Sequence, residues 1–187
     1  DLWQLEEGYK NWLTSSCTFH NTLVDRIVPG YPRNEIEEYN SKLDYQDNLM
    51  VTAEPFFLWV IEGDEALKQK LPFHKTDLNV KIVDDMQDFR TLKVRILNGA
   101  HTAMVPFSLL YGNETVRQTV DGAFTGKFVD EVITEINGTL AMDKDEVNSY
   151  AEEVMDRFRN PFIIHKLSDI ALNSVSKFKV RVLPSLL

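Results

Sequence analysis

The chain has 187 residues, a formal net charge of −9, 43% hydrophobic residues and 26% charged residues. That length can bury a core in one or two domains, and the composition is ordinary for a globular protein. The acidic balance disfavours nucleic acid and anionic lipid as partners, because both favour a basic surface. The longest apolar run, residues 55–61, is far shorter than the ~20 residues that cross a bilayer.

Cysteine usage and the first residues bear on the compartment. The single Cys17 excludes an intramolecular disulfide and fits a reducing cytoplasm. The chain opens on Asp1-Leu2-Trp3 without the basic segment of a signal peptide, so we expect a cytoplasmic protein. His20 lies near Cys17, but no further ligand stands at zinc spacing, so no metal site is predicted.

Hydrophobic periodicity and turn signals predict strands near the start of the chain and helices through the rest. In chain order, we expect a helix over 2–14, a strand within 17–28, a short helix over 35–39, strands at 50–53, 56–61 and 82–85, helices over 86–110, 116–122, 124–136, 143–159 and 168–175, and a tail over 176–187. Asn34 and Asp143 are candidate helix N-caps, with Glu146 at the capping-box position of the second. The pattern predicts a mainly α fold.

Lys93, Asn98 and His101 share the helix expected over residues 86–110, in which Gly99 and Pro106 are candidate interruptions. At ~100° per residue the three polar side chains project to roughly 0°, 140° and 80°, so they fan over less than half of the helix. The long Lys arm can therefore converge with the other two on a small ligand. Gly99 costs ~1 kcal/mol relative to Ala inside a helix, which indicates close approach of another element or a ligand.

The same residues also fit readings without catalysis: a solvated lysine, a histidine packed in a core, and a helix that ends at Asn98-Gly99. The chain contains no Gly-x-Gly-x-x-Gly, Walker A or Gly-x-Ser-x-Gly pattern. The residues alone therefore indicate no nucleotide cradle.

Four segments, in order, carry a resemblance to one family: residues 21–29, 53–61, 93–102 and 157–161. They resemble the mannitol dehydrogenase family, the polyol-specific long-chain dehydrogenases. The signature of that family is a Lys, an Asn five residues later and a His three residues further, which Lys93, Asn98 and His101 match. Residues 28–33, 78–85, 98–103 and 174–184 are most similar to the branch that reduces tagaturonate to altronate in hexuronate catabolism.

The resemblance implies an NAD-dependent oxidoreductase with a Rossmann-like cofactor domain followed by a mainly α substrate domain of the 6-phosphogluconate-dehydrogenase C-terminal type. Residues 1–29 would be the closing helix and strand of the first domain, and residues 30–187 the second domain. The glycine fingerprint would then precede residue 1, and we expect this piece alone to be inactive. The implied partner is a small-molecule substrate, and nothing in the residues indicates an oligomeric state.

The resemblance also implies roles for single residues. Lys93 would be the general acid/base, Asn98 would hydrogen-bond the developing alkoxide, and His101 would orient substrate hydroxyls. Asp25 and Lys177 match substrate-binding positions. Asp169 stands where the mannitol enzymes carry an Arg, eight residues before Lys177. The cations that we consider for a substrate carboxylate are Lys166, Lys177, Lys179 and Arg181, of which Lys177 is favoured.

Other functions stay open from the residues. Within the family, the substrate can be the epimeric fructuronate or mannitol. Outside it, the chain can be a non-enzymatic α-helical interaction module with an acidic face. A metal-dependent hydrolase built on His20, His74, His101 and His165 lacks ligand spacing on any one element.

Overall fold

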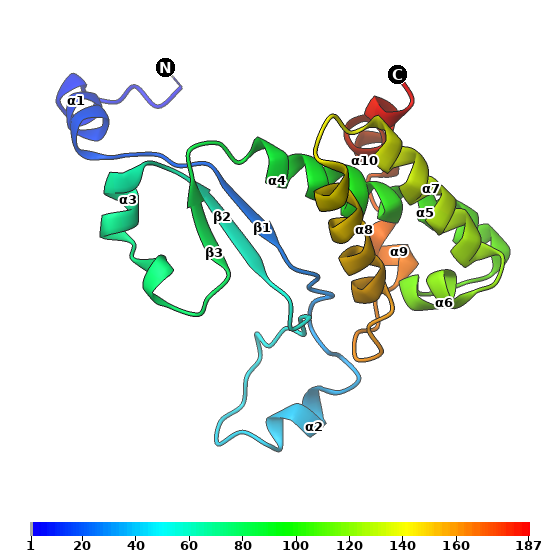
Figure 1. Cartoon of the computed structure of the whole chain (residues 1–187). Helices are drawn as coiled ribbons and strands as arrows, with labels where there is room; N and C mark the ends of the chain where they lie inside the picture. The colour runs from blue at the N-terminus through cyan, green and yellow to red at the C-terminus, as the bar shows by residue number, and fades with distance from the viewer. Residues whose placement is uncertain (1) are drawn as a thin grey trace.

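A three-stranded sheet forms the first part of the computed structural model, which describes residues 2–187 (Figure 1). Its order is β1 (Thr22–Asp25), β2 (Leu58–Glu62) and β3 (Val80–Val83). β1 pairs antiparallel with β2, whereas β2 and β3 are parallel and joined through α3 (Glu65–Lys70) and the 3-10 turn η1 (Phe73–Lys75). Parallel neighbours need such a crossover, and this unit is typical of a Rossmann-like sheet.

Two helices lie away from this sheet. α1 (Glu7–Ser16) precedes it at the N-terminus, and α2 (Ile36–Asn40) lies on a long excursion between β1 and β2 (Figure 1). The expected strand at 50–53 is wrong: it forms only an isolated bridge between Thr52 and Gly30. Asn34 does not cap α2, which starts after Glu35 without a side-chain cap, and α3 was not predicted.

The second part of the chain is a helical bundle. It contains α4 (Gln87–Thr91), the π-helical segment η2 (Leu92–Leu97), α5 (Asn98–Tyr111), α6 (Val116–Asp121), α7 (Thr125–Thr139), α8 (Lys144–Phe158), α9 (Leu167–Ile170), α10 (Ser174–Arg181) and the 3-10 turn η3 (Leu183–Ser185). α5 lies centrally and contacts α6, α7, α9 and α10. Fully buried Ile96, Met104, Val129, Val154 and Leu167 form the middle of the core. The mainly α fold with a few early strands is confirmed.

Several local predictions are confirmed and others are corrected. The carboxylate of Asp143 accepts hydrogen bonds from the backbone N–H groups of Asp145 and Glu146, as an N-cap of α8 should. The helix through residues 87–111 is interrupted at neither Gly99 nor Pro106. The expected helix 168–175 and tail are instead α9 and α10, separated by Asn173 in a left-handed conformation (φ 60°).

Candidate active site

The π-helical segment η2 sets the relation between Lys93 and Asn98. The backbone N–H of Asn98 donates to the carbonyl of Lys93, five residues earlier, instead of the fourth residue back as in an α-helix. A hydrogen bond over five residues closes one wide turn. The two residues therefore lie nearer to each other around the axis than the α-helical projection predicts, and π turns of this kind are frequent at functional sites.

The amine of Lys93 reaches from this turn to the sheet. Its Nζ donates to the carbonyl oxygen of Val24 in β1, and the side chain is half-buried. Burial lowers the pKa of Lys93 below its ordinary value. The charge of Asp25 opposes that shift, while the positive charges of Arg157 and Arg181 add to it. A lysine with a lowered pKa is suited to give and take a proton near neutral pH.

His101 is buried on the next turns of the same helix. Its ring centroid lies 4.4 Å from that of Phe158 and 4.9 Å from that of His165. Within residues 2–187, its Nε2 atom has no hydrogen-bond partner. Burial, followed by the charges of His165, Arg181 and other cations, holds the pKa of His101 well below its ordinary value, so the ring is neutral at pH 7.

This burial predicts a pH dependence of stability. The unfolded His101 takes up a proton at its ordinary pKa of about 6.5, whereas the folded ring stays neutral, so below that pH the unfolded state binds more protons. The free energy of unfolding should therefore fall on acidification, by up to about 1.4 kcal/mol per pH unit for this one group. Urea denaturation at several pH values between 5 and 7 gives the free energy of unfolding at each pH. This free energy should change less with pH in His101→Phe than in the unmodified protein. An unchanged pH dependence in the variant would contradict this prediction.

Asn98 and Gly99 occupy the start of α5. The Asn98 side-chain amide is half-buried and makes no hydrogen bond to other described residues, while its backbone carbonyl accepts one from Thr102 Oγ1 (2.8 Å). A Cβ on Gly99 would lie 3.3 Å from the backbone carbonyl oxygen of Arg181 and 3.4 Å from Ile136. The close approach of α10 thus accounts for the glycine, as the sequence indicated.

Asp25 belongs to a buried ionic network formed with Glu54, Arg157 and Tyr150. Arg157 donates to both oxygens of Asp25 (2.8 and 3.2 Å), and the Tyr150 hydroxyl donates to Oδ2 (2.6 Å). Arg157 also binds Glu54, whose Oε1 accepts a further hydrogen bond from the backbone N–H of Ile27. Both Asp25 oxygens therefore already have protein partners. The expected direct contact of Asp25 with substrate stays a prediction. In the structure, Asp25 follows Val24, whose carbonyl accepts the hydrogen bond from Lys93, and its charge acts on the Lys93 amine.

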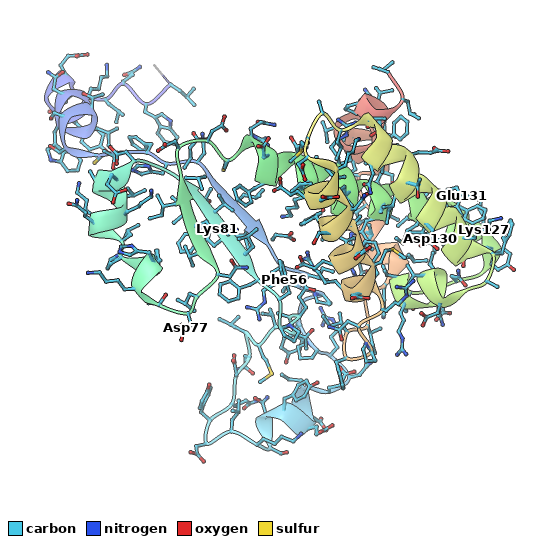
Figure 2. All side chains as sticks on the ribbon, in the orientation of Figure 1. Phe56, Asp77, Lys81, Lys127, Asp130 and Glu131 are labelled. Atoms are coloured by element: carbon cyan, nitrogen blue, oxygen red, sulfur yellow. The ribbon has the colours of Figure 1, made fainter. Side chains whose placement is uncertain are left out.

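This network joins the two parts of the molecule. Asp25 ends β1 and Glu54 precedes β2, whereas Arg157 lies near the end of α8. The guanidinium carbon of Arg157 also lies 4.1 Å from the ring centroid of Phe56, which Figure 2 labels between the sheet and the helices. Sequence reasoning assigned no role to Glu54, Tyr150 or Arg157, because their partners are 103 to 132 residues apart.

Lys177 and Arg181 approach the same helix from α10. Lys177 Nζ donates to the carbonyl of Ile170 (2.8 Å), and Arg181 Nη1 donates to Thr102 Oγ1 (3.3 Å). The charge of Arg181 acts on Lys93, on His101 and on Lys177, so the guanidinium lies near all three. The structure thus gathers Lys93, Asn98, His101 and Lys177 and, of the other candidate cations, brings Arg181 to the same place.

Two negative findings concern other kinds of site. None of the helices in residues 2–187 has the length and apolar character required to span a membrane. In the same residues, no three His, Cys, Asp or Glu side chains cluster as a metal site would require.

Two family models match the chain in succession. The mannitol dehydrogenase Rossmann domain matches residues 2–75, and the mannitol dehydrogenase C-terminal domain matches residues 85–187. Altronate oxidoreductase of Bacillus subtilis (strain 168) is 51% identical and that of Yersinia pestis 50% identical, each over 186 residues and 99% of this chain. The chain spans only 38% of the length of each relative.

Two solved structures share the fold. One is the Pseudomonas fluorescens mannitol 2-dehydrogenase ternary complex with NAD and D-mannitol, with a TM-score of 0.73 at 24% identity. The other is D-sorbitol dehydrogenase in its substrate-free form, with a TM-score of 0.67 at 24% identity. Each comparison covers 94% of this chain and 36% of the solved chain. They confirm a Rossmann-like start followed by a helical domain.

Proposed function

Because this chain belongs to the mannitol dehydrogenase family, we propose that it is the substrate-binding and proton-transferring part of an NAD-dependent oxidoreductase that reduces tagaturonate to altronate. The observation that carries the proposal is the half-buried Lys93, with its lowered pKa, one π turn from the amide of Asn98. The altronate oxidoreductases that are about half identical over the whole chain support the substrate. The same argument supports a role in hexuronate catabolism, and the single cysteine supports a cytoplasmic location.

The side chains divide the work of carbonyl reduction. Lys93 gives its Nζ proton to the ketone oxygen of the substrate, and in oxidation the neutral amine takes the proton back from the hydroxyl. The amide N–H of Asn98 donates to the same oxygen as negative charge develops on it. The unpartnered Nε2 of the neutral His101 is suited to hydrogen-bond a substrate hydroxyl. Lys177 lies beside the same helix as a second substrate contact.

The dinucleotide site requires residues beyond those described. Residues 2–187 contain no glycine-rich turn between a strand and a helix, so they do not form a dinucleotide cradle by themselves. In the full-length protein, bound NADH would supply the hydride for reduction, and NAD⁺ would accept it in oxidation. The residues of this chain hold the substrate and move the proton.

We also propose where the two domains meet. The pairing of β1 with β2, and of β2 with β3, supports assigning the whole sheet to the Rossmann-like domain. The matched ranges fit this division, because the match to the C-terminal domain begins at residue 85, just after β3, which places the domain border there. The border predicted after residue 29 would cut this sheet between its first and second strands.

An assay of the full-length protein tests the function. With NADH present, we expect rapid oxidation of NADH with tagaturonate and slower oxidation with fructuronate or fructose. The isolated 187-residue chain is expected to give no turnover, because it lacks most of the cofactor site. Preference for fructuronate or fructose would replace the substrate assignment, and inactivity of the full-length protein toward all three would refute the proposal.

A further inference from the structure

The end of α10 presents two cations without an acidic partner. Arg181 donates to the neutral hydroxyl of Thr102, and Lys177 donates to the backbone carbonyl of Ile170. Among residues 2–187, no carboxylate oxygen lies within 4.0 Å of either side chain, although the chain carries 29 acidic residues. By contrast, the nearby Arg157 binds two carboxylates. Two positive charges without a carboxylate partner thus lie beside the continuous helix of η2 and α5 that carries Lys93, Asn98 and His101.

Arg181 is held at the site by a short chain of contacts. Its Nη1 binds Thr102 Oγ1, and the same hydroxyl donates to the carbonyl of Asn98. The backbone of Arg181 packs against the α5 glycine. Because a guanidinium has five N–H donors and one serves Thr102, the rest of the planar fork is available to a ligand. Burial without a counter-charge lowers the pKa of Arg181, which indicates that the group is partly removed from water.

The other candidate cations lie elsewhere. Lys166 and Lys179 are both exposed, and neither acts electrostatically on Lys93 or His101. Arg181 acts on both. The protein as a whole is acidic, so its long-range field repels an anionic substrate. An anion is therefore favoured only where cations are concentrated locally.

We propose that the Arg181 guanidinium, fixed by Thr102 and assisted by Lys177, binds the carboxylate of the sugar-acid substrate and so selects it over neutral ketoses. The inference rests on the proposed function. A planar guanidinium pairs with a carboxylate through two parallel hydrogen bonds, which no hydroxymethyl group can replace. Arg181 is thus a specificity-determining residue. From α10 it contacts the face of α5 that carries Asn98 and Thr102, while Lys93 serves the reacting carbonyl.

The test compares Arg181→Gln with the unmodified full-length enzyme on two substrates. These are tagaturonate and the neutral ketohexose in which a CH2OH group replaces its carboxylate. We expect kcat/KM for the sugar acid to fall by roughly 100-fold, mainly through KM, because the carboxylate charge is the same in ground and transition states. For the neutral ketose, kcat/KM should fall far less, and its measurable turnover shows that the variant folds. A change shared by both substrates reports the loss of the Arg181 charge near Lys93. Arg181→Lys should recover part of the loss, since it keeps the charge without the fork.

Two charge-matched variants complete the design. Lys127→Gln, on the exposed face of α7 where Figure 2 labels Lys127, should leave both substrates unaffected. Lys179→Gln tests the alternative cation of α10. If Arg181→Gln keeps the preference for the acid, or if Lys179→Gln abolishes it, this inference is overturned while the proposed function stands. If the unmodified enzyme prefers the neutral ketose, both fail.

Discussion

Replacing Lys93 by alanine in the full-length protein is expected to lower kcat by about 10²- to 10⁴-fold, the range that a positioned general acid or base contributes. Alanine carries no group that can give or take a proton, so the change removes the proposed acid/base entirely. The loss should appear in kcat and kcat/KM together, because proton transfer is an interaction of the transition state. Steady-state kinetics with tagaturonate and NADH measures it.

The pH profile separates proton transfer from a structural effect of the same change. Oxidation needs the neutral amine, so its rate should rise as pH passes upward through the lowered pKa of Lys93. Reduction needs the protonated amine, so its rate should fall over the same range. In Lys93→Ala, both the rise of the oxidation rate and the fall of the reduction rate with pH should disappear. The exposed Lys127→Ala is the matched control, and near-normal turnover by Lys93→Ala would refute the assignment.

The second large effect is expected from Arg157→Met in the buried network. The change leaves the carboxylates of Asp25 and Glu54, each 1% exposed, without their cation. Breaking a buried ion pair by removing one partner typically costs about 3–5 kcal/mol, because a charge stays buried without compensation. Urea denaturation of the full-length protein should show that loss of unfolding free energy. The domains should also separate more easily, since Arg157 joins the sheet to α8.

Two further variants test whether the unpaired charges cause the loss. Arg159→Met removes a surface cation two residues later, whose contact with Asp156 is 4.0 Å and exposed, so it should cost less than about 0.5 kcal/mol. Adding Asp25→Asn and Glu54→Gln to Arg157→Met should restore part of the stability, because no buried charge is then left alone. If Arg157→Met alone costs less than about 1 kcal/mol, the network does not hold the domains together.

The helical half of the fold could be predicted because its signals are local. Apolar spacing of three to four residues located α7 and α8, and Asp143 marked the start of α8. The first half was predicted less well. Residues 50–53 have strand-forming side chains but no partner strand beyond one bridge to Gly30. Strand pairing depends on residues distant in sequence, so a local pattern does not decide it.

In the candidate site, too, the local features could be predicted from the sequence and the long-range contacts could not. The sequence by itself determined that Lys93, Asn98 and His101 share one helix, because residue spacing along a helix defines a face. The tertiary structure alone decided the π turn between Lys93 and Asn98, the enclosure of Asp25 by Arg157, and the approach of Arg181 to Thr102. These contacts join residues up to 132 positions apart, and burial and unpaired charge arise only when the packed chain removes such groups from water.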